Sequence, residues 1–144
     1  MVNLMPTANE VFLDTAYAIA LASERDNYHA AAIVLAETLR MQGVKLVTTQ
    51  AVLLEIGNAL SKARYRAGAV RLLTAIEADP NIEVVPLTHD LYMRAMRLFR
   101  ERTDKEWGLT DCVSFVVMSD RALSLALTPD NHFRQAGYTA LLLE

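Results

Sequence analysis

The chain has 144 residues, 53% of them hydrophobic, and a formal net charge of −3 at pH 7. The length suits one compact domain, and the apolar content excludes a disordered chain. The net charge excludes a protein that binds nucleic acid indiscriminately through overall positive charge. No apolar run reaches the ~18 residues of a membrane span, and the first ten residues lack the pattern of a signal peptide. Because Cys112 is the only cysteine, no internal disulfide can form, and we expect a cytoplasmic protein.

The first half of the chain predicts two strands and four helices after an irregular lead-in at residues 1–9. Short apolar runs predict the strands, while Ala- and Leu-rich stretches with one apolar face predict the helices. Gly68 predicts a break between two of these helices. The expected elements are a strand at 10–14, helices at 15–22 and 27–41, a strand at 44–48, and helices at 50–65 and 69–78.

The second half continues the alternation of strands and helices, with a polar loop at 103–108. Pro86 ends one strand, and the apolar stretch after the loop predicts a buried helix. The expected elements are a strand at 82–85, helices from 88 or 89 to 102 and at 110–121, a strand at 123–127, a turn or short helix at 131–135, and a strand at 139–143.

This alternation predicts an α/β fold. Strands that alternate with helices form right-handed βαβ units, which place helices on both faces of a parallel sheet. We therefore expect a three-layer α/β/α sandwich with a mainly parallel central sheet of about five strands. The sequence has no internal repeat and no stretch that resembles a linker, so residues 1–144 are expected to form a single domain.

Four acids follow strands or occupy helix starts where the topology brings them to one edge of this sheet. Asp14 closes the first strand, and Asp130 follows the fourth strand by three residues. Glu55 lies in the second turn of the helix that leaves the second strand. Asp111 opens the helix that leads into the fourth strand, and this helix must begin at the carboxyl edge because the strand is parallel. Ligands of open α/β sheets bind at that edge.

Clustered carboxylates are the ligands that Mg²⁺ prefers, and their mutual repulsion is relieved by a bound cation or a shared proton. A cation held there can activate water for displacement at phosphorus. Each acid alone has a simpler structural explanation, as a turn residue, a helix-start residue or a solvated helix residue. Their joint placement is what favours a site. Asp104 lies on the loop between two helices and is a candidate fifth acid.

Other polar residues give weaker indications. His29, His89 and His132 lack the spacing of a zinc site, although His132 follows Asp130 closely enough for a structural or substrate-contact role. Cys112 is expected in the core. Two basic clusters are explained either as solvated helix faces or as a path for a phosphate backbone. They comprise Lys62, Arg64, Arg66 and Arg71 in one cluster, and Arg94, Arg97, Arg100, Arg102 and Lys105 in the other.

Four segments together resemble a known family. They are Val-Phe-Leu-Asp-Thr at 11–15, Thr-Gln-Ala-Val-Leu-Leu-Glu-Ile-Gly-Asn-Ala-Leu at 49–60, Leu-Thr-Asp-Cys-Val-Ser-Phe-Val-Val-Met at 109–118, and Ala-Leu-Thr-Pro-Asp-Asn-His-Phe at 126–133. In order and spacing they resemble the PIN domain, and within it the VapC-like toxins of type II toxin–antitoxin pairs. The resemblance extends from about residue 10 to the end of the chain.

The resemblance implies an endoribonuclease that depends on Mg²⁺ or Mn²⁺ and cuts RNA phosphodiester bonds. It places the family's four acids on Asp14, Glu55, Asp111 and Asp130. Thr15 and Thr110, beside two of these acids, are implied to orient a ligand or water. The resemblance further implies a homodimer and a small antitoxin protein that masks the site, with no membrane association.

Three alternatives remain open at this stage. A PIN-domain nuclease can serve ordinary RNA processing rather than act as a toxin. A phosphotransfer domain would use Asp14 as a nucleophile, but position 16 is Ala where a haloacid dehalogenase-like enzyme needs a second acid. A non-catalytic module would bind RNA or a protein partner without metal.

Overall fold

The computed structural model describes residues 9–144, so residues 1–8 of the lead-in predicted for residues 1–9 lie outside the described part. Five strands form one sheet in the order β3-β2-β1-β4-β5, and every neighbouring pair is parallel. The strands are β1 (Glu10–Leu13), β2 (Lys45–Thr49), β3 (Ile82–Val85), β4 (Leu125–Leu127) and β5 (Thr139–Ala140). The predicted parallel sheet of about five strands is confirmed.

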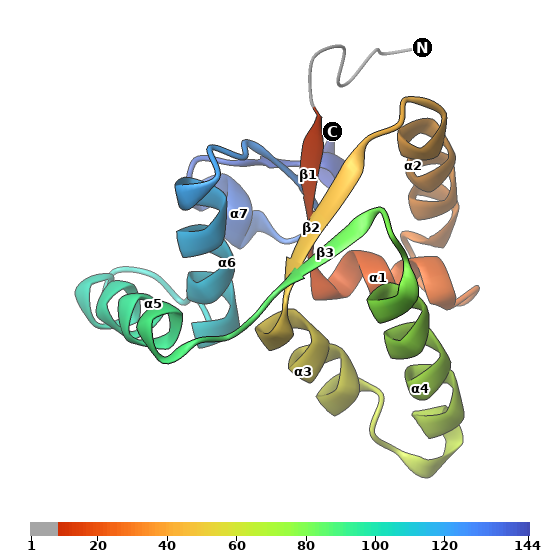
Figure 1. Cartoon of the computed structure of the whole chain (residues 1–144), viewed down its shortest axis with the longest axis horizontal. Helices are drawn as coiled ribbons and strands as arrows, with labels where there is room; N and C mark the ends of the chain where they lie inside the picture. The colour runs from red at the N-terminus through yellow and green to blue at the C-terminus, as the bar shows by residue number, and fades with distance from the viewer. Residues whose placement is uncertain (1–8) are drawn as a thin grey trace.

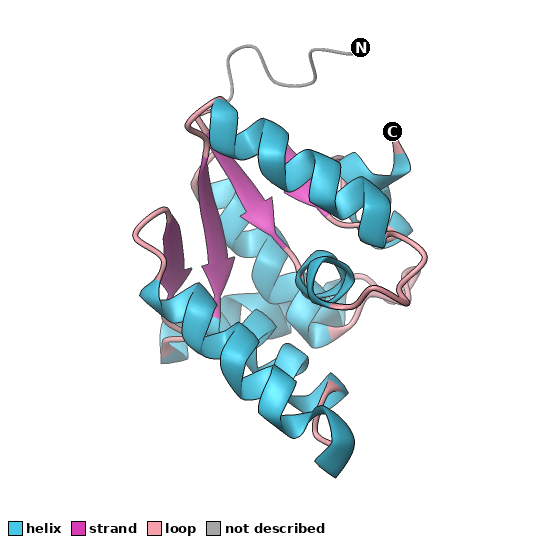
Figure 2. Ribbon diagram, turned by 90° about the vertical axis from the view of Figure 1, so that its right-hand side faces the viewer, coloured by secondary structure: helices cyan, strands magenta, loops and turns pink. Residues whose placement is uncertain are grey.

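Helices cover both faces of the sheet (Figure 1). One side carries α1, α2 and α4, and the other carries α5, α6 and α7, while α3 lies at the carboxyl ends of the strands and packs against α1, α4 and α6. Figure 2 shows helices flanking the strands after a quarter turn. The helices are α1 (Thr15–Ala22), α2 (His29–Met41), α3 (Gln50–Ala59), α4 (Ala63–Ala78), α5 (His89–Glu101), α6 (Leu109–Asp120) and α7 (Asn131–Gln135).

The order of strands places a topological switch point between β1 and β4. From β1 the chain moves outward to β2 and β3 with helices on one face, then crosses to β4 and β5 with helices on the other face. Loops that leave β1 and β4 at their carboxyl ends therefore diverge in opposite directions. This divergence opens the crevice in which such folds bind ligands.

The central strands are buried because both of their faces are covered by helices. Phe12 and Leu13 of β1 pair with Ala126 and Leu127 of β4, and none of these four is more than 3% exposed. Phe133 of α7 packs near Phe12, with ring centroids 6.2 Å apart. Because apolar packing fixes β1, β4 and α7 together, the polar residues at their ends are held in fixed positions. No helix in residues 9–144 is long and apolar enough to cross a membrane.

The prediction of the α3–α4 boundary was wrong. The sequence suggested one helix to residue 65 and a break at Gly68, whereas α3 ends at Ala59 and α4 runs unbroken from Ala63 through Gly68. Lys62 is extended at the junction, and the Arg66 side chain donates two hydrogen bonds to the Ser61 carbonyl. A glycine costs a helix only about 1 kcal/mol relative to alanine, so packing along α4 retains it.

The last strand is also shorter than predicted. Only Thr139 and Ala140 pair with β4, and residues 141–143 form a 3₁₀ turn in place of a strand. The turn forms where the backbone N–H of Leu142 bonds to the carbonyl of Thr128, and Leu141 and Leu142 are buried. An apolar segment that packs against the core can therefore resemble a strand in sequence although it does not pair with the sheet.

Candidate active site

The switch point between β1 and β4 carries a buried acid. Asp14 follows β1 directly, is 4% exposed, and donates its backbone N–H to the Leu127 carbonyl at the end of β4. Its Oδ2 accepts a 2.8 Å hydrogen bond from the hydroxyl of Thr128. Two neighbouring strand ends thus fix this carboxyl at the crevice.

Burial makes the charge on Asp14 costly. Desolvation is the main reason that its pKa is raised from 3.8 to about 7, and the nearby carboxylates of Asp111 and Glu55 raise it further. The hydrogen bonds from Thr128 and from the Thr15 backbone N–H act in the opposite direction. A carboxyl with this pKa is partly protonated at neutral pH unless a positive charge approaches it.

Asp111, Asp130 and His132 form a second group beside Asp14. One ligand atom from each lies within 4.8 Å of the others. Asp111 Oδ2 accepts from the Gly108 backbone N–H at 3.1 Å and lies 3.0 Å from His132 Nδ1. Burial is the main cause of a raised pKa at Asp111, and the charge of Asp130 adds to it. The predicted proximity of His132 to the acids is therefore present in the structure.

Asp130 sits at the start of α7. Its Oδ1 accepts a 2.8 Å hydrogen bond from the His132 backbone N–H, and its own N–H donates to the Thr128 hydroxyl at 3.0 Å. Asp111 likewise caps α6, so both acids also have the helix-start role that a structural explanation would give them. That role fixes their positions, but it does not account for the raised pKa of Asp111, to which burial contributes most and the charge of Asp130 adds.

Glu55 approaches the acids from α3. Its charge acts on Asp14, and it lines a cavity of about 280 Å³ together with Thr110, Leu54 and Tyr92. Thr110 in its wall directly precedes Asp111 in the chain. The structure thus brings Asp14, Asp111 and Asp130 together at the ends of β1 and β4 and the start of α6, and Glu55, in the middle of α3, is close enough for its charge to act on Asp14.

Two threonines beside Asp14 differ in their bonding. Thr128 bonds to both Asp14 and Asp130, yet the sequence analysis did not select it as a site residue. A hydroxyl residue directly after an apolar strand and two residues before an acid is a signal that could have found it. The hydroxyl oxygen of Thr15 is buried and has no hydrogen-bond partner in the described part of the chain.

Asp104 is not brought into this cluster. Its carboxylate accepts two hydrogen bonds from Arg102, at 2.9 and 3.0 Å, and its side chain is 60% exposed. The bonds from Arg102 are the main reason that its pKa is lowered to about 2. An exposed acid paired with arginine shares neither the burial nor the raised pKa of Asp14 and Asp111.

The donor set fits a hard divalent cation. The predicted ligands are carboxylates, which suit Mg²⁺ or Mn²⁺ better than the softer metals. Burial is the main cause of the raised pKa values of Asp14 and Asp111, neighbouring carboxylates add to it, and a cation would offset both effects. The buried hydroxyl of Thr15 adds a further oxygen with no protein partner.

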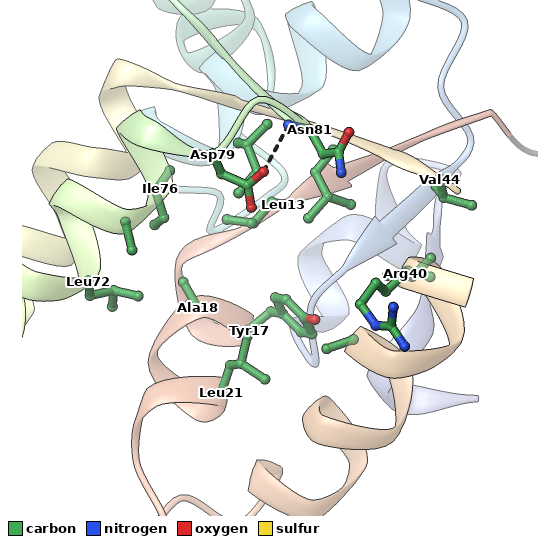
Figure 3. A pocket seen from close by; sticks show the side chains of 15 residues that line it. Leu13, Tyr17, Ala18, Leu21, Arg40, Val44, Leu72, Ile76, Asp79 and Asn81 are labelled. Carbon is green, nitrogen blue, oxygen red and sulfur yellow. Dashed lines mark hydrogen bonds between the residues drawn. The ribbon is translucent and has the colours of Figure 1, made fainter. Parts of the chain in front are cut away.

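A second cavity does not compete with this site. It has a volume of about 320 Å³ and lies among α1, α2, α4 and the adjoining strands (Figure 3). Its walls are mostly apolar, and its one carboxylate, Asp79, accepts a 2.8 Å hydrogen bond from the Asn81 backbone N–H. Without a second acid, a nucleophile or a histidine in its walls, this cavity offers no group for catalysis.

The fold and the acid cluster define the class, a doubly wound α/β protein with an acidic crevice at its switch point. A family model described as PIN domain matches residues 11–137, so the chain belongs to the PIN domain family. A sequence comparison with curated proteins gave no match.

Two solved structures share the fold. VapC20 from Mycobacterium tuberculosis, a toxin described as cleaving the sarcin–ricin loop, is 25% identical to this chain, with a TM-score of 0.78 over 90% of this chain and 96% of that one. VapBC2 from Rickettsia felis, solved bound to a DNA fragment from its promoter, is 15% identical, with a TM-score of 0.65 over 88% and 92%. The fold is thus that of VapC-type PIN domains, as the sequence resemblance indicated.

Proposed function

We propose that this protein is a metal-dependent endoribonuclease and the toxin of a toxin–antitoxin pair. The single observation that carries the proposal is the group of acids at the carboxyl ends of β1 and β4, where Asp111 and Asp130 have ligand atoms within 4.8 Å of each other and burial raises the pKa of both Asp14 and Asp111. The PIN family match and the likeness to VapC20 support the same activity.

In this proposal the four acids hold one or two Mg²⁺ or Mn²⁺ ions. Bound there, the cation would activate a water and stabilise the leaving oxygen of a phosphodiester. Thr128 orients the Asp14 carboxylate through a 2.8 Å hydrogen bond, and His132 does the same for Asp111 across 3.0 Å. Such supporting contacts fix the direction of ligand oxygens. Thr15 and Thr110 are assigned supporting roles toward water or substrate.

The activity is tested by incubating the protein with a panel of RNAs, including a sarcin–ricin loop, with Mg²⁺ and with EDTA. We expect cleavage in Mg²⁺ only, and loss of cleavage in Asp14→Asn and in Asp111→Asn. Glu106→Gln is the matched control, because Glu106 is exposed and lies outside the cluster. Full cleavage in both Asn variants, or in excess EDTA, would contradict the proposal.

The biological role is tested separately from the chemistry. A toxin should arrest growth when expressed alone, and co-expression of the protein encoded by a small neighbouring gene should restore growth. The likeness to VapBC2 supports such a partner. Cleavage without growth arrest would instead favour a nuclease of ordinary RNA processing.

We also propose a homodimer. Leu54 and Tyr92 are 62% and 39% exposed and line the same cavity as Glu55, so a second copy that covers them would enclose the site. Light scattering should give twice the mass of the chain, and Leu54→Asp should shift the protein toward the monomer. A wild-type monomer at all concentrations would contradict this assignment.

The phosphotransfer alternative has less support. Asp14 is 4% exposed and its Oδ2 is engaged by Thr128, so its carboxylate has little freedom to attack phosphorus. Incubation with a small phosphate donor followed by mass spectrometry should give no aspartyl-phosphate on Asp14.

A further inference from the structure

A third cavity lies between the end of α1 and the first half of α4, next to Leu60 at the end of α3. It has a volume of about 860 Å³ and three arginines in its walls, with no carboxylate among its lining residues. Arg25 comes from the segment after α1, and Arg64 and Arg71 come from α4. We call it the basic cavity. In Figure 1, α3 and α4 lie side by side and α1 runs toward α4.

The charged residues in the stretch of sequence that forms most of this cavity are all basic. Between Glu55 and Glu77 the chain has four basic residues and no acid, although the whole protein has a net charge of −3. Lys62 and Arg64 stand at the start of α4, whose first turn contains no acid. Positive side chains at that end oppose the helix dipole, so their placement does not serve the stability of the helix.

In residues 9–144, the arginines of the basic cavity share with Arg66, Arg97 and Arg100 the lack of an ion pair, and in this they differ from the remaining arginines. Five others pair with carboxylates, namely Arg40 with Glu37, Arg94 with Asp120, Arg102 with Asp104, Arg121 with Glu83, and Arg134 with Glu144. In residues 9–144, no ion pair joins Arg25, Arg64 or Arg71 to an acid within 4.0 Å. Their charges are therefore available to an anionic ligand.

The cavity combines charge with an aromatic ring. Arg64, Gly68 and Arg71 share one face of α4, because they are four and three residues apart. A Cβ at Gly68 would lie 3.7 Å from the Arg71 guanidinium, so the guanidinium lies close to the backbone of Gly68. The Tyr65 ring, 44% exposed, lines the same space, and the Arg64 guanidinium lies 4.8 Å from its centre. Grooves for single-stranded nucleic acid combine basic and aromatic side chains in this way.

Two walls of the basic cavity continue from the acid site. α1 begins directly after Asp14 and ends at Ala22 in the cavity wall, and Leu60 follows α3 five residues after Glu55. At ~1.5 Å per residue, those five residues span about 7.5 Å. A polymer bound at the acids therefore reaches the basic cavity within a short distance.

We infer that the basic cavity binds the phosphate backbone of single-stranded RNA next to the bond held at the acids, with Arg25, Arg64 and Arg71 contacting phosphate and Tyr65 contacting a base. This inference rests on the proposed ribonuclease function and assigns where its substrate lies. An acidic protein segment is the competing occupant, but it would not need the exposed aromatic ring.

The test measures binding of a short fluorescein-labelled single-stranded RNA in EDTA, by anisotropy over a series of KCl concentrations. The double variant Arg64→Ala/Arg71→Ala should bind about ten-fold more weakly at low salt, and the slope of log affinity against log salt should fall by about 1.4, or ~0.7 for each lost phosphate contact. In Mg²⁺, its KM for RNA should rise while kcat stays within about two-fold.

The matched control is Arg97→Ala. Arg97 on α5 is exposed, has no ion pair in the described residues, and lies outside the cavity lining. Equal effects of the double variant and of Arg97→Ala on RNA binding and KM would overturn the inference. If the double variant loses binding to poly-glutamate but binds RNA as the wild type does, the inference is overturned and an acidic protein segment is the occupant of the cavity.

Failure of the wider proposal is distinguishable from failure of this inference. A wild-type protein that cleaves RNA but does not depend on Arg64 and Arg71 overturns only the inference. A wild-type protein that neither binds nor cleaves any RNA overturns both. Because both arginines are exposed, the double variant should unfold within a few degrees of the wild type, which a thermal melt checks.

Discussion

The crevice at the end of β1 and the α3–α4 pair share one helix but carry charge in opposite ways. At the crevice, Asp14 is buried, the charges of Asp111 and Glu55 act on it, and burial above all raises its pKa to about 7. Beside α4, like charges are exposed and lack counter-ions. Elsewhere on the surface, five arginines pair with acids, whereas Arg97 and Arg100 on α5 have no ion pair in the described residues. Uncompensated charge thus occurs in two adjoining regions, one suited to a cation and the other to an anion.

The largest effect should come from removing the buried charge. In Asp14→Asn we expect RNA cleavage to fall at least about 100-fold, because one ligand oxygen is replaced by an amide that neither neutralises nor holds a cation as well. Rates are measured under single-turnover conditions. Folding is checked by circular dichroism, and a variant with more than a tenth of wild-type activity would show that Asp14 is dispensable.

The same variant should alter the pH dependence of stability in the absence of divalent cations. Between about pH 4 and pH 7 the folded wild type keeps a proton on Asp14 that the unfolded chain has lost. Its free energy of unfolding therefore falls as the pH rises through this range, by up to about 4 kcal/mol. Asp14→Asn should lack this fall. Urea denaturation at a series of pH values measures it, and parallel curves for the two proteins would contradict the raised pKa.

Thr128→Val should have a smaller effect than Asp14→Asn on both RNA cleavage and the free energy of unfolding. Valine has nearly the same shape but leaves Asp14 Oδ2 and the Asp130 N–H without their partner. We expect a loss of about 1–3 kcal/mol in stability and a 10- to 100-fold loss in cation affinity or cleavage. Thr128→Ser, which keeps the hydroxyl, should recover most of the activity. Equal activity of the Val and Ser variants would exclude an orienting role.

The smallest effect is expected at Asp104. Because this acid is exposed and paired with Arg102, Asp104→Asn should leave cleavage within about two-fold of wild type and stability within about 1 kcal/mol. A large loss of cleavage would show that Asp104 belongs to the active site. It would also contradict the distinction between the acids around Asp14 and the exposed acids that pair with arginine.

The sequence was sufficient for the parts of the fold that depend on local pattern. Asp14 and Asp130 could be placed because each follows an apolar strand, and parallel strands bring their ends to one edge. The α3–α4 junction was missed because Gly68 is a poor helix residue in isolation, whereas tertiary packing along α4 retains it. Thr128 was missed because its partner Asp14 is 114 positions away in the chain, a relation that no local pattern contains.

Cation binding by the four acids is tested most directly by calorimetric titration with Mn²⁺ at neutral pH. We predict that the wild type binds the ion, that Asp14→Asn and Asp111→Asn lose this binding, and that Glu106→Gln retains it. Unchanged Mn²⁺ binding in both Asn variants, or no binding by the wild type, would contradict the assignment of this crevice as a metal centre.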